Sequence, residues 1–290
     1  MAWYAFWRRK QKPQPVDVQR GGMRIFGGRR FKRGVPYILP SDAGELNRLD
    51  FQHYLLRSAL RGNYASPLRD PRAILDVACG TGRWAIEMAS MFPQASTVGF
   101  DMTPLPPDAG AAHNFTFVQG NMFEGLPFPD DSFDFVHQRL VTVAIPTTQW
   151  LPQVQELLRV TRPGGWVELV EGDLLPGGAG LTMLNDLGER MSLKRGMSFS
   201  NASRIDEYLR QAGARQIERR VIYLPVGQVA GRLGAMAETD YLAILTSVRG
   251  FLISQGLITE EEHTQALEQA QAELASGRFM WPFYIAYGQK

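Results

Sequence analysis

A carboxylate and a glycine turn stand together where an apolar stretch ends. The stretch 74–78 contains Asp76 and leads into Gly80-Thr81-Gly82. Glycine permits positive φ and a close approach of the backbone to a ligand, and a helix beginning here adds free N–H groups and a partial positive charge. Asp101 follows 21 residues after Gly80, where a carboxylate can accept both hydroxyls of a ribose. This spacing indicates a ligand that carries a nucleoside.

The same turn admits two classes of ligand. Read as Gly80-x-Gly82-x-x-Ala85, it formally fits the dinucleotide fingerprint, so an NAD(P) oxidoreductase stays open. Two details argue against it. Asp76 would oppose a pyrophosphate, and about 70 residues precede a strand with which dinucleotide folds usually open. Both details suit S-adenosylmethionine (SAM), which carries an ammonium group and a sulfonium.

These residues must be positioned by the region 71–226, in which strand and helix patterns alternate. Short apolar stretches predict strands, and apolar residues three and four apart predict helices. The alternation predicts an α/β fold with a doubly wound parallel sheet. The predicted strands are 73–78, 96–101, 115–120, 133–138, 166–171 and 215–224, and the predicted helices are 82–91, 149–160, 181–194 and 201–211.

Two segments outside this region are expected to cover the site. Residues 41–70 contain Asp42 and Glu45 at capping-box spacing, followed by apolar residues three and four apart, which predicts a leader helix. Residues 227–277 are long for a connection between strands, and such insertions usually form a lid or a substrate wall. The insertion contains two predicted helices, and residues 278–290 add the final strand; the predicted bounds are 229–248, 260–275 and, for the strand, 279–287.

Four motifs resemble those of class I methyltransferases, in the same order and spacing. Ala78 stands where the family's turn carries its first glycine, while the last two glycines are in place. The resemblance implies a Rossmann-like, seven-stranded sheet, mostly parallel with an antiparallel last strand, and SAM as the cofactor. The motifs are the acid and glycine turn of 74–85, Gly120-Asn121-Met122, the approach to the fourth strand at 126–134, and the turn into the fifth strand at 159–165.

The segment 39–68 is similar to the leader of the LaeA-like methyltransferases, through LPSD, RLDFQHY and LRGNY. This family is known best from fungal regulators of secondary metabolism. It implies SAM binding and a leader helix over the cofactor. It fixes no methyl acceptor, so a protein that binds SAM without methylating, as a regulator or for another reaction, stays open.

The resemblance also implies which residues contact the cofactor. The glycine turn and the acid after the second strand would hold the nucleoside, and residues 121–122 would flank the adenine. Two leader-helix residues would cover the cofactor, with Arg57 pairing with its carboxylate. The expected cofactor-binding residues are Asp76, Ala78, Cys79, Gly80, Thr81, Gly82, Asp101, Met102, Asn121, Met122, Gln138, Tyr54 and Arg57.

The expected reaction is an in-line displacement at the methyl group of SAM, with S-adenosylhomocysteine (SAH) as product. The protein then chiefly aligns the acceptor and keeps water out. A general base is needed only if the nucleophile is protonated, and His137 and Glu171 are the candidates. The apolar residues expected around the pocket favour a small or medium-sized organic acceptor over nucleic acid.

The composition of the chain excludes several other classes of protein. Cys79 is the one cysteine in 290 residues, which excludes an internal disulfide framework and a cysteine-cluster zinc site, and no metal is expected. No run of 18 apolar residues predicts a transmembrane helix, and the first ten residues do not resemble a secretory signal. We therefore expect a cytoplasmic protein without a membrane partner.

The arm of residues 1–40 differs from the rest in charge. Residues 1–33 hold ten Lys and Arg and one acidic residue, whereas the remaining 257 residues carry a net charge of −7. A nucleic-acid enzyme usually carries its basic surface on the body of the domain, so an RNA methyltransferase is the less favoured alternative. The aromatic residues of the arm predict packing on the body or on a second copy, as a homodimer; they are Trp3, Tyr4, Phe6 and Trp7.

Overall fold

The computed structural model describes residues 22–32, 39–40, 42–107, 109–110, 112–276 and 279–290. A seven-stranded sheet forms its centre, and a two-stranded hairpin precedes the sheet along the chain. The hairpin consists of β1 (Met23–Phe26) and β2 (Arg29–Lys32). The strands of the sheet are β3 (Ala73–Val77), β4 (Ser96–Asp101), β5 (Phe115–Gln119), β6 (Phe133–Arg139), β7 (Thr161–Gly172), β8 (Arg215–Val226) and β9 (Phe279–Gln289).

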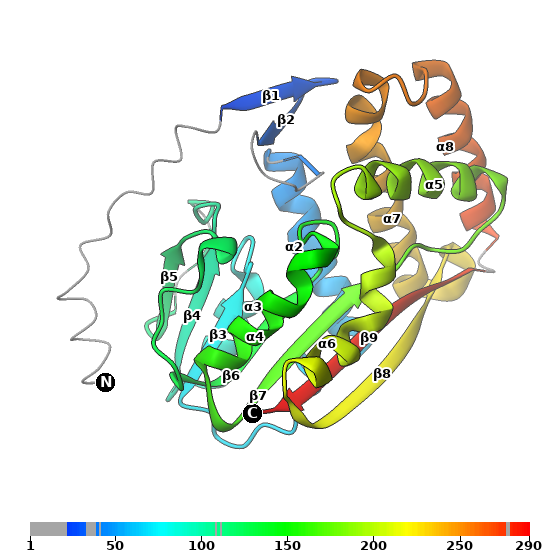
Figure 1. Ribbon diagram of the computed structural model, residues 1–290. Helices are drawn as coiled ribbons and strands as arrows, with labels where there is room; N and C mark the ends of the chain where they lie inside the picture. Colours follow the sequence, from blue (N-terminus) through cyan, green and yellow to red (C-terminus); the bar gives the residue numbers. More distant parts are fainter. Residues whose placement is uncertain (1–21, 33–38, 41, 108, 111, 277–278) are drawn as a thin grey trace.

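The strands are ordered β5-β4-β3-β6-β7-β9-β8 across the sheet. Neighbours from β5 to β7 run parallel, whereas β9 is antiparallel to both β7 and β8. Figure 1 shows β9, drawn in red, between these two strands. The predicted Rossmann-like sheet with an antiparallel last strand is thus confirmed. The strand order reverses at β3, and ligands of open parallel sheets bind at such a switch point.

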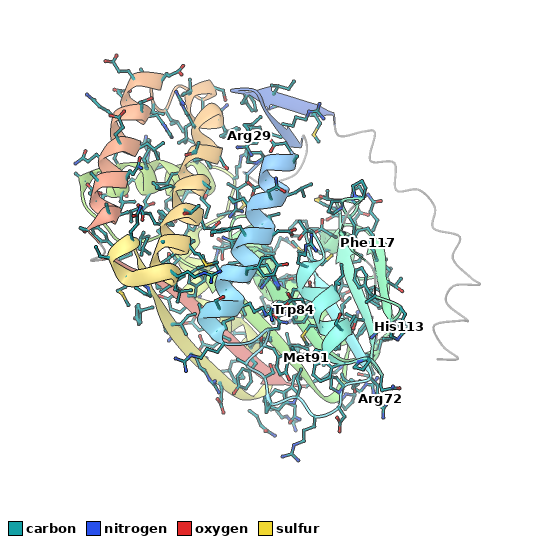
Figure 2. All side chains as sticks on the ribbon, turned by 180° about the vertical axis from the view of Figure 1, so that it is seen from behind. Arg29, Arg72, Trp84, Met91, His113 and Phe117 are labelled. Carbon is teal, nitrogen blue, oxygen red and sulfur yellow. The ribbon has the colours of Figure 1, made fainter. Side chains whose placement is uncertain are left out.

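Helices cover both faces of the sheet, as a doubly wound fold requires. On one face, α4 (Trp150–Val160) packs on β6 and β7, and α6 (Ile205–Gln211) packs on β8 and β9. On the other face, α3 (Arg83–Met91) packs on β3, β4 and β5, and α2 (Ala43–Leu60) lies against α3. Figure 2 views this second face. Short 3₁₀ turns are η2 (Met122–Glu124), η3 (Thr147–Gln149), η4 (Phe199–Arg204) and η5 (Gln228–Ala230).

Three further helices stand together at one end of the sheet (Figure 1). They are α5 (Ala179–Leu193), α7 (Gly231–Ser254) and α8 (Glu260–Ala275). Their apolar side chains form one buried cluster with those of α2 and β9. The two helices predicted within 227–277 are therefore present, although α7 continues past the predicted end at 248. Helix α7 packs against both α2 and β8, so it joins the leader helix to the sheet.

Two charged contacts fix the first half of α2. Asp42 caps the helix by accepting a hydrogen bond from the Glu45 backbone N–H at 3.1 Å, and it also accepts two from the Arg29 guanidinium of the hairpin, at 2.6 and 2.8 Å. The buried Arg48 donates to Glu45 at 2.7 Å and to Asp240 of α7 at 3.0 Å. Breaking a buried pair leaves an uncompensated charge, so these bonds set how α2 lies against α7.

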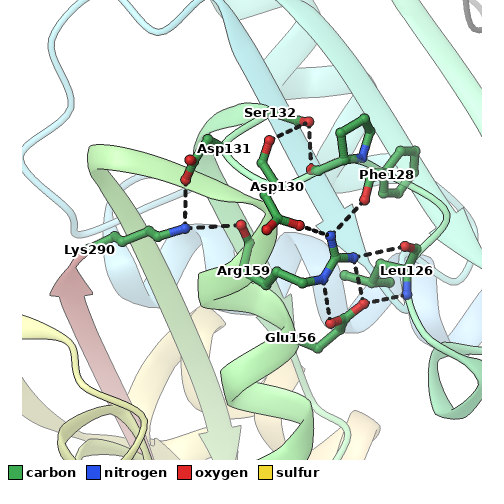
Figure 3. Close-up of polar contacts among 9 residues, drawn as sticks. Leu126, Phe128, Asp130, Asp131, Ser132, Glu156, Arg159 and Lys290 are labelled. Atoms are coloured by element: carbon green, nitrogen blue, oxygen red, sulfur yellow. Dashed lines mark hydrogen bonds and ion pairs between the residues drawn. The ribbon is translucent and has the colours of Figure 1, made fainter.

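Arg159 of α4 holds the segment that leads into β6 (Figure 3). Its guanidinium donates to the Phe128 carbonyl at 2.9 Å, to Asp130 at 2.6 Å and to Glu156 at 2.7 Å. These bonds to two carboxylates raise the pKa of Arg159. Lys290 donates to the Arg159 carbonyl at 3.0 Å and so attaches the end of the chain to the same place. Two of the four motifs, 126–134 and 159–165, therefore stabilise the sheet and line neither of the two cavities described below. The second was predicted as a turn before the strand, but β7 already begins at Thr161.

The four aromatic residues predicted to pack at the start of the arm lie outside the described residues. In the part of the chain that the structure describes, no helix combines the length and apolar character needed to cross a membrane. The same part brings no three His, Cys, Asp or Glu side chains into a group that could hold a metal ion.

Two glycines of α5 provide a matched test of how this helix packs. A Cβ on Gly180 would lie 2.7 Å from the Ala270 backbone nitrogen of α8, whereas a Cβ on Gly188 meets nothing within 4 Å. We expect Gly180→Ala to lower the free energy of unfolding by about 1–3 kcal/mol through overpacking. Gly188→Ala is expected to raise it by about 0.5–1 kcal/mol, because alanine is the better helix former.

Urea unfolding of the two variants, followed by circular dichroism, measures both changes. Effects of the same sign in the two variants would contradict the close packing of α5 on α8.

Candidate functional site

The turn after β3 has an unusual backbone. Ala78, Gly80 and Gly82 all have left-handed φ values, of 59°, 55° and 78°. A residue with a side chain loses on the order of 1 kcal/mol in this conformation. The family's turn carries a glycine where this chain has Ala78, and the left-handed φ explains why glycine suits that position. At Gly82 space is also limited, because a Cβ would lie 2.9 Å from Leu105 Cδ2. The turn brings the backbone N–H groups at the start of α3 to the carboxyl edge of the sheet.

Asp101, the last residue of β4, holds this turn in place. Its Oδ2 accepts a hydrogen bond from the Gly80 N–H at 2.9 Å, and its Oδ1 accepts one from the Thr103 N–H at 2.7 Å. The Cys79 N–H donates to the Phe100 carbonyl at 3.1 Å. A carboxylate has about four acceptor positions, and Asp101 also lines the cavity that lies over the turn.

A cavity of about 280 Å³ lies over the turn. Its walls come from α2, from the ends of β3 and β4, and from the segments that follow β5 and β6. This is the site expected at the switch point of the sheet. The lining residues are Pro40, Glu45, Leu46, Leu49, Gln52, His53, Asp76, Ala78, Cys79, Gly80, Thr81, Arg83, Phe100, Asp101, Met102, Thr103, Gly120, Asn121, Met122, Phe123, Arg139, Leu140, Val141 and Ala144.

One side of the cavity is built for close approach and apolar contact. A Cβ on Gly120 would lie 2.6 Å from the Phe100 ring, so only glycine fits there. Asn121 caps the 3₁₀ turn η2 by accepting a hydrogen bond from the Phe123 N–H at 3.1 Å. Met102 and Met122 add flexible apolar surface. This wall can enclose a flat base such as adenine.

Asp76 enters the cavity from β3 and is held from behind. Its Oδ1 lies 2.9 Å from His137 Nδ1, and the His137 ring stacks on Trp84 with centroids 3.8 Å apart. Trp84 is fixed in turn by its Nε1–H, which donates to the Asn63 carbonyl at 2.7 Å. His137 is 1% exposed and lines neither cavity. The structure therefore places it behind Asp76.

Arg139, which the sequence analysis did not single out, faces the same cavity. Its Nη2 lies 2.9 Å from His53 Nδ1, and no carboxylate of the described residues forms an ion pair with it. Burial lowers the pKa of Arg139, while Asp76 and Glu87 oppose that shift. Burial and the neighbouring Arg139 lower the pKa of His53 to about 4, so His53 is neutral at neutral pH and can accept from the guanidinium. The cavity thus presents a cation beside the Asp76 carboxylate.

The structure brings together most of the residues predicted to bind the cofactor. Nine of them line the cavity, and Gly82 closes the turn beneath it. The nine are Asp76, Ala78, Cys79, Gly80, Thr81, Asp101, Met102, Asn121 and Met122.

Three predicted cofactor residues lie elsewhere. Gln138 points to the other face of the sheet, where its Oε1 accepts from Gln153 Nε2 at 2.9 Å. Tyr54 is exposed, and the exposed Arg57 pairs with Glu87 at 3.0 Å. The leader helix does cover the cavity, but with a different face, which carries Glu45, Leu46, Leu49, Gln52 and His53.

Glu171, the second predicted base, lines a separate cavity of about 120 Å³. Its oxygens accept hydrogen bonds from the Val141 N–H at 3.0 Å, the Thr142 N–H at 3.0 Å and the Thr142 hydroxyl at 2.6 Å. Complete burial raises the pKa of Glu171 to about 7, although these bonds oppose the shift. The carboxylate therefore anchors the segment after β6, which contributes to both cavities.

Comparison with known proteins gives the site a family context. Residues 74–165 match the family model described as "Methyltransferase domain". The N-methyltransferase sirN of Leptosphaeria maculans is 30% identical over 215 residues, which cover 70% of this chain and 76% of that protein. Methyltransferase str3 of Strobilurus tenacellus is 40% identical over 150 residues, 51% of this chain and 52% of that protein.

The secondary metabolism regulator laeA of Monascus pilosus is 33% identical over 170 residues, 57% of this chain and 44% of that protein. The chain thus spans about half the length of str3 and laeA and most of sirN. Among solved structures, a putative methyltransferase from an antibiotic biosynthesis pathway of Anabaena variabilis aligns with a TM-score of 0.52 at 16% identity, covering 77% of this chain and 92% of that one. This last likeness concerns the fold alone.

The turn predicts a specific effect of Asp101→Asn. The amide keeps one acceptor but turns an NH₂ group toward one of the two backbone N–H donors, which leaves that bond unmade. We expect SAH affinity, measured by isothermal titration calorimetry, to fall about tenfold or more.

The matched control is Asp186→Asn, which changes an exposed carboxylate of α5. Unchanged SAH affinity in Asp101→Asn would contradict the role of this carboxylate.

Proposed function

Because the chain belongs to the class I SAM-dependent methyltransferases, and among them to the LaeA-like family, we propose that it methylates a small or medium-sized organic acceptor. We further propose that this acceptor belongs to secondary metabolism, since the relatives named above include a regulator of secondary metabolism and an N-methyltransferase. The observation that carries the proposal is the cavity over the glycine turn, which joins Asp76, Asp101 and Arg139 on one apolar-walled site.

The charges of this cavity match the polar groups of SAM. In this proposal Asp101 accepts hydrogen bonds from the ribose hydroxyls, and Asp76 accepts hydrogen bonds from the ammonium group. Arg139 is placed to donate to the carboxylate, since its one hydrogen-bond partner in the described residues is the neutral His53. A carboxylate and a cation on one wall complement the zwitterionic amino-acid part of the cofactor. When bound, SAM supplies the electrophilic methyl group on its sulfonium.

The protein's own contribution is then alignment and exclusion of water. His137 as general base stays a prediction, and its position behind Asp76 supports a different role, that of orienting the Asp76 carboxylate. Glu171 as general base also stays a prediction, because its oxygens hold the segment after β6. An acceptor whose nucleophile is already deprotonated needs neither.

Ligand-dependent stability tests the cofactor assignment. We expect SAH at one hundred times its Kd to stabilise the full chain by about 2.7 kcal/mol, seen as a rise in melting temperature, and NAD to leave the melting temperature unchanged. A response to NAD alone would instead support the oxidoreductase alternative. Incubation with methyl-labelled SAM and extract then measures transfer. Cofactor binding without label in any acceptor would support the non-methylating alternative.

The variant Arg139→Met tests the proposed contact between Arg139 and the carboxylate of the cofactor. Methionine keeps much of the apolar bulk and removes the charge, so SAH affinity is expected to fall about tenfold to a hundredfold. Affinity for 5′-methylthioadenosine, which lacks the amino-acid part, is expected to stay the same. Calorimetric titration with both ligands measures the difference.

Arg57→Met is the comparison, because Arg57 is the cation that the sequence analysis placed on the carboxylate. Loss of SAH affinity in Arg57→Met, with none in Arg139→Met, would reverse the assignment.

A further inference from the structure

The second cavity, of about 120 Å³, adjoins the first. It lies between α2, α5 and α7, over the segments that follow β6 and β7. Leu49, Gln52 and Leu140 line both cavities. The two cavities are therefore neighbours that share these three lining residues among the part of the chain that the structure describes.

Most polar side chains around this cavity are already paired with the protein. The Tyr241 hydroxyl donates to Asn185 at 2.6 Å and accepts from the Leu175 N–H at 3.0 Å. The Trp281 Nε1–H donates to the Asp173 carbonyl at 2.7 Å. What these residues offer a ligand is their apolar and aromatic surface, together with Leu184, Met191 and Phe199. This cavity is of the same order of size as an engineered apolar cavity of about 150 Å³ that binds benzene, and it also adjoins the first cavity, so a small ring or a short branched chain is the size of group that suits it.

Asp173 is the exception. Asp173 lines the cavity, and among the described residues its carboxylate accepts one hydrogen bond, from the Leu174 N–H at 2.7 Å. None of the Lys and Arg side chains that the structure describes forms an ion pair with it. Burial and the nearby Glu189 raise the pKa of Asp173, whose carboxylate lacks a compensating charge.

Among the described residues that line this cavity, Arg48 is the one cation, and it does not supply that compensation. Arg48 is bonded to Glu45 and to Asp240. Glu171 adds a further acidic group to the same wall. The pKa of Glu171 is raised to about 7, so Asp173 is the acidic group on which the charge of this cavity depends, and no described cation pairs with it. An apolar surface beside such a carboxylate favours an ammonium group over a second carboxylate.

We propose that the second cavity is the acceptor site, and that it takes the aromatic or alkyl part of a molecule whose ammonium group pairs with Asp173. This inference rests on the proposed methyltransferase function and adds the chemical class of the acceptor. It distinguishes amine-bearing acceptors from carboxylic acids and from neutral alcohols of the same shape.

Three compounds of similar shape test the proposal on the full chain saturated with SAH. They are 2-phenylethylamine, 2-phenylethanol and 3-phenylpropanoate, titrated calorimetrically at pH 7. The amine is expected to bind at least about tenfold more tightly than the alcohol, because hydrogen bonds between charged groups are the stronger ones. The carboxylate is expected to show no binding. Equal affinities for amine and alcohol, or no binding of the amine, overturn the proposal.

Two variants locate the binding. Asp173→Asn keeps the acceptor for the Leu174 N–H and is expected to remove the preference for the amine, whereas the control Asp186→Asn preserves it. Gly188→Leu fills the cavity from α5, where a Cβ meets nothing within 4 Å, and is expected to abolish binding of the amine. Retention of the preference in Asp173→Asn, or of amine binding in Gly188→Leu, overturns the proposal.

SAH affinity is measured in every variant and shows that the fold and the cofactor cavity are intact. Loss of the amine preference with normal SAH binding supports the acceptor site. An amine that fails to bind while SAH binds normally defeats this inference and leaves the methyltransferase function standing. Failure of SAH to bind the unmodified chain defeats the proposed function itself.

Discussion

The carboxylate of Asp101 is the constraint on which the cofactor cavity depends. Its hydrogen bonds to the Gly80 and Thr103 N–H groups join the turn after β3 to the segment after β4. Because the turn passes through left-handed φ at Ala78, Gly80 and Gly82, it needs such an external partner to stay in one conformation. The direction of the α3 N-terminus follows from it, whereas Asp76 is positioned by β3 and by its contact with His137.

Six strands of the sheet could be predicted to within two residues, since the turn residues that bound them are clear in the sequence. Strand β7 begins at Thr161, five residues before the predicted start at 166. The end of α7 could not be predicted, since glycine inside a helix usually weakens it. The structure supplies the reason for Gly250: a Cβ there would lie 2.7 Å from the Phe26 carbonyl oxygen, so the glycine lets the hairpin approach the helix. Contacts between residues so far apart in sequence leave no local pattern.

The contrast between local patterns and long-range contacts applies to the site as well. Residues of the turn between β3 and α3 were predicted because the local sequence of a strand, a glycine turn and a helix places them at the edge of the sheet. The leader helix was expected, but Tyr54 and Arg57, the two residues predicted to cover the cofactor, do not line the cavity. The rotation of α2 is decided by buried bonds from Arg48 and Gln52 to Asp240, about 190 positions away. Arg139 was missed because β6 runs one residue further than predicted. Residues two apart on a strand share a face. Because His137 was predicted to face the site, the same reasoning could have identified Arg139, two residues further along β6.

Helix α2 contributes Leu49 and Gln52 to the walls of both cavities, and Asp240 of α7 holds Gln52 at 2.8 Å. If a ligand in either cavity displaces α2, the binding of the two ligands cannot be thermodynamically independent. Whatever factor the first imposes on the affinity of the second, the second imposes equally on the first. A single helix thereby gives the molecule a means of making two binding events reciprocal.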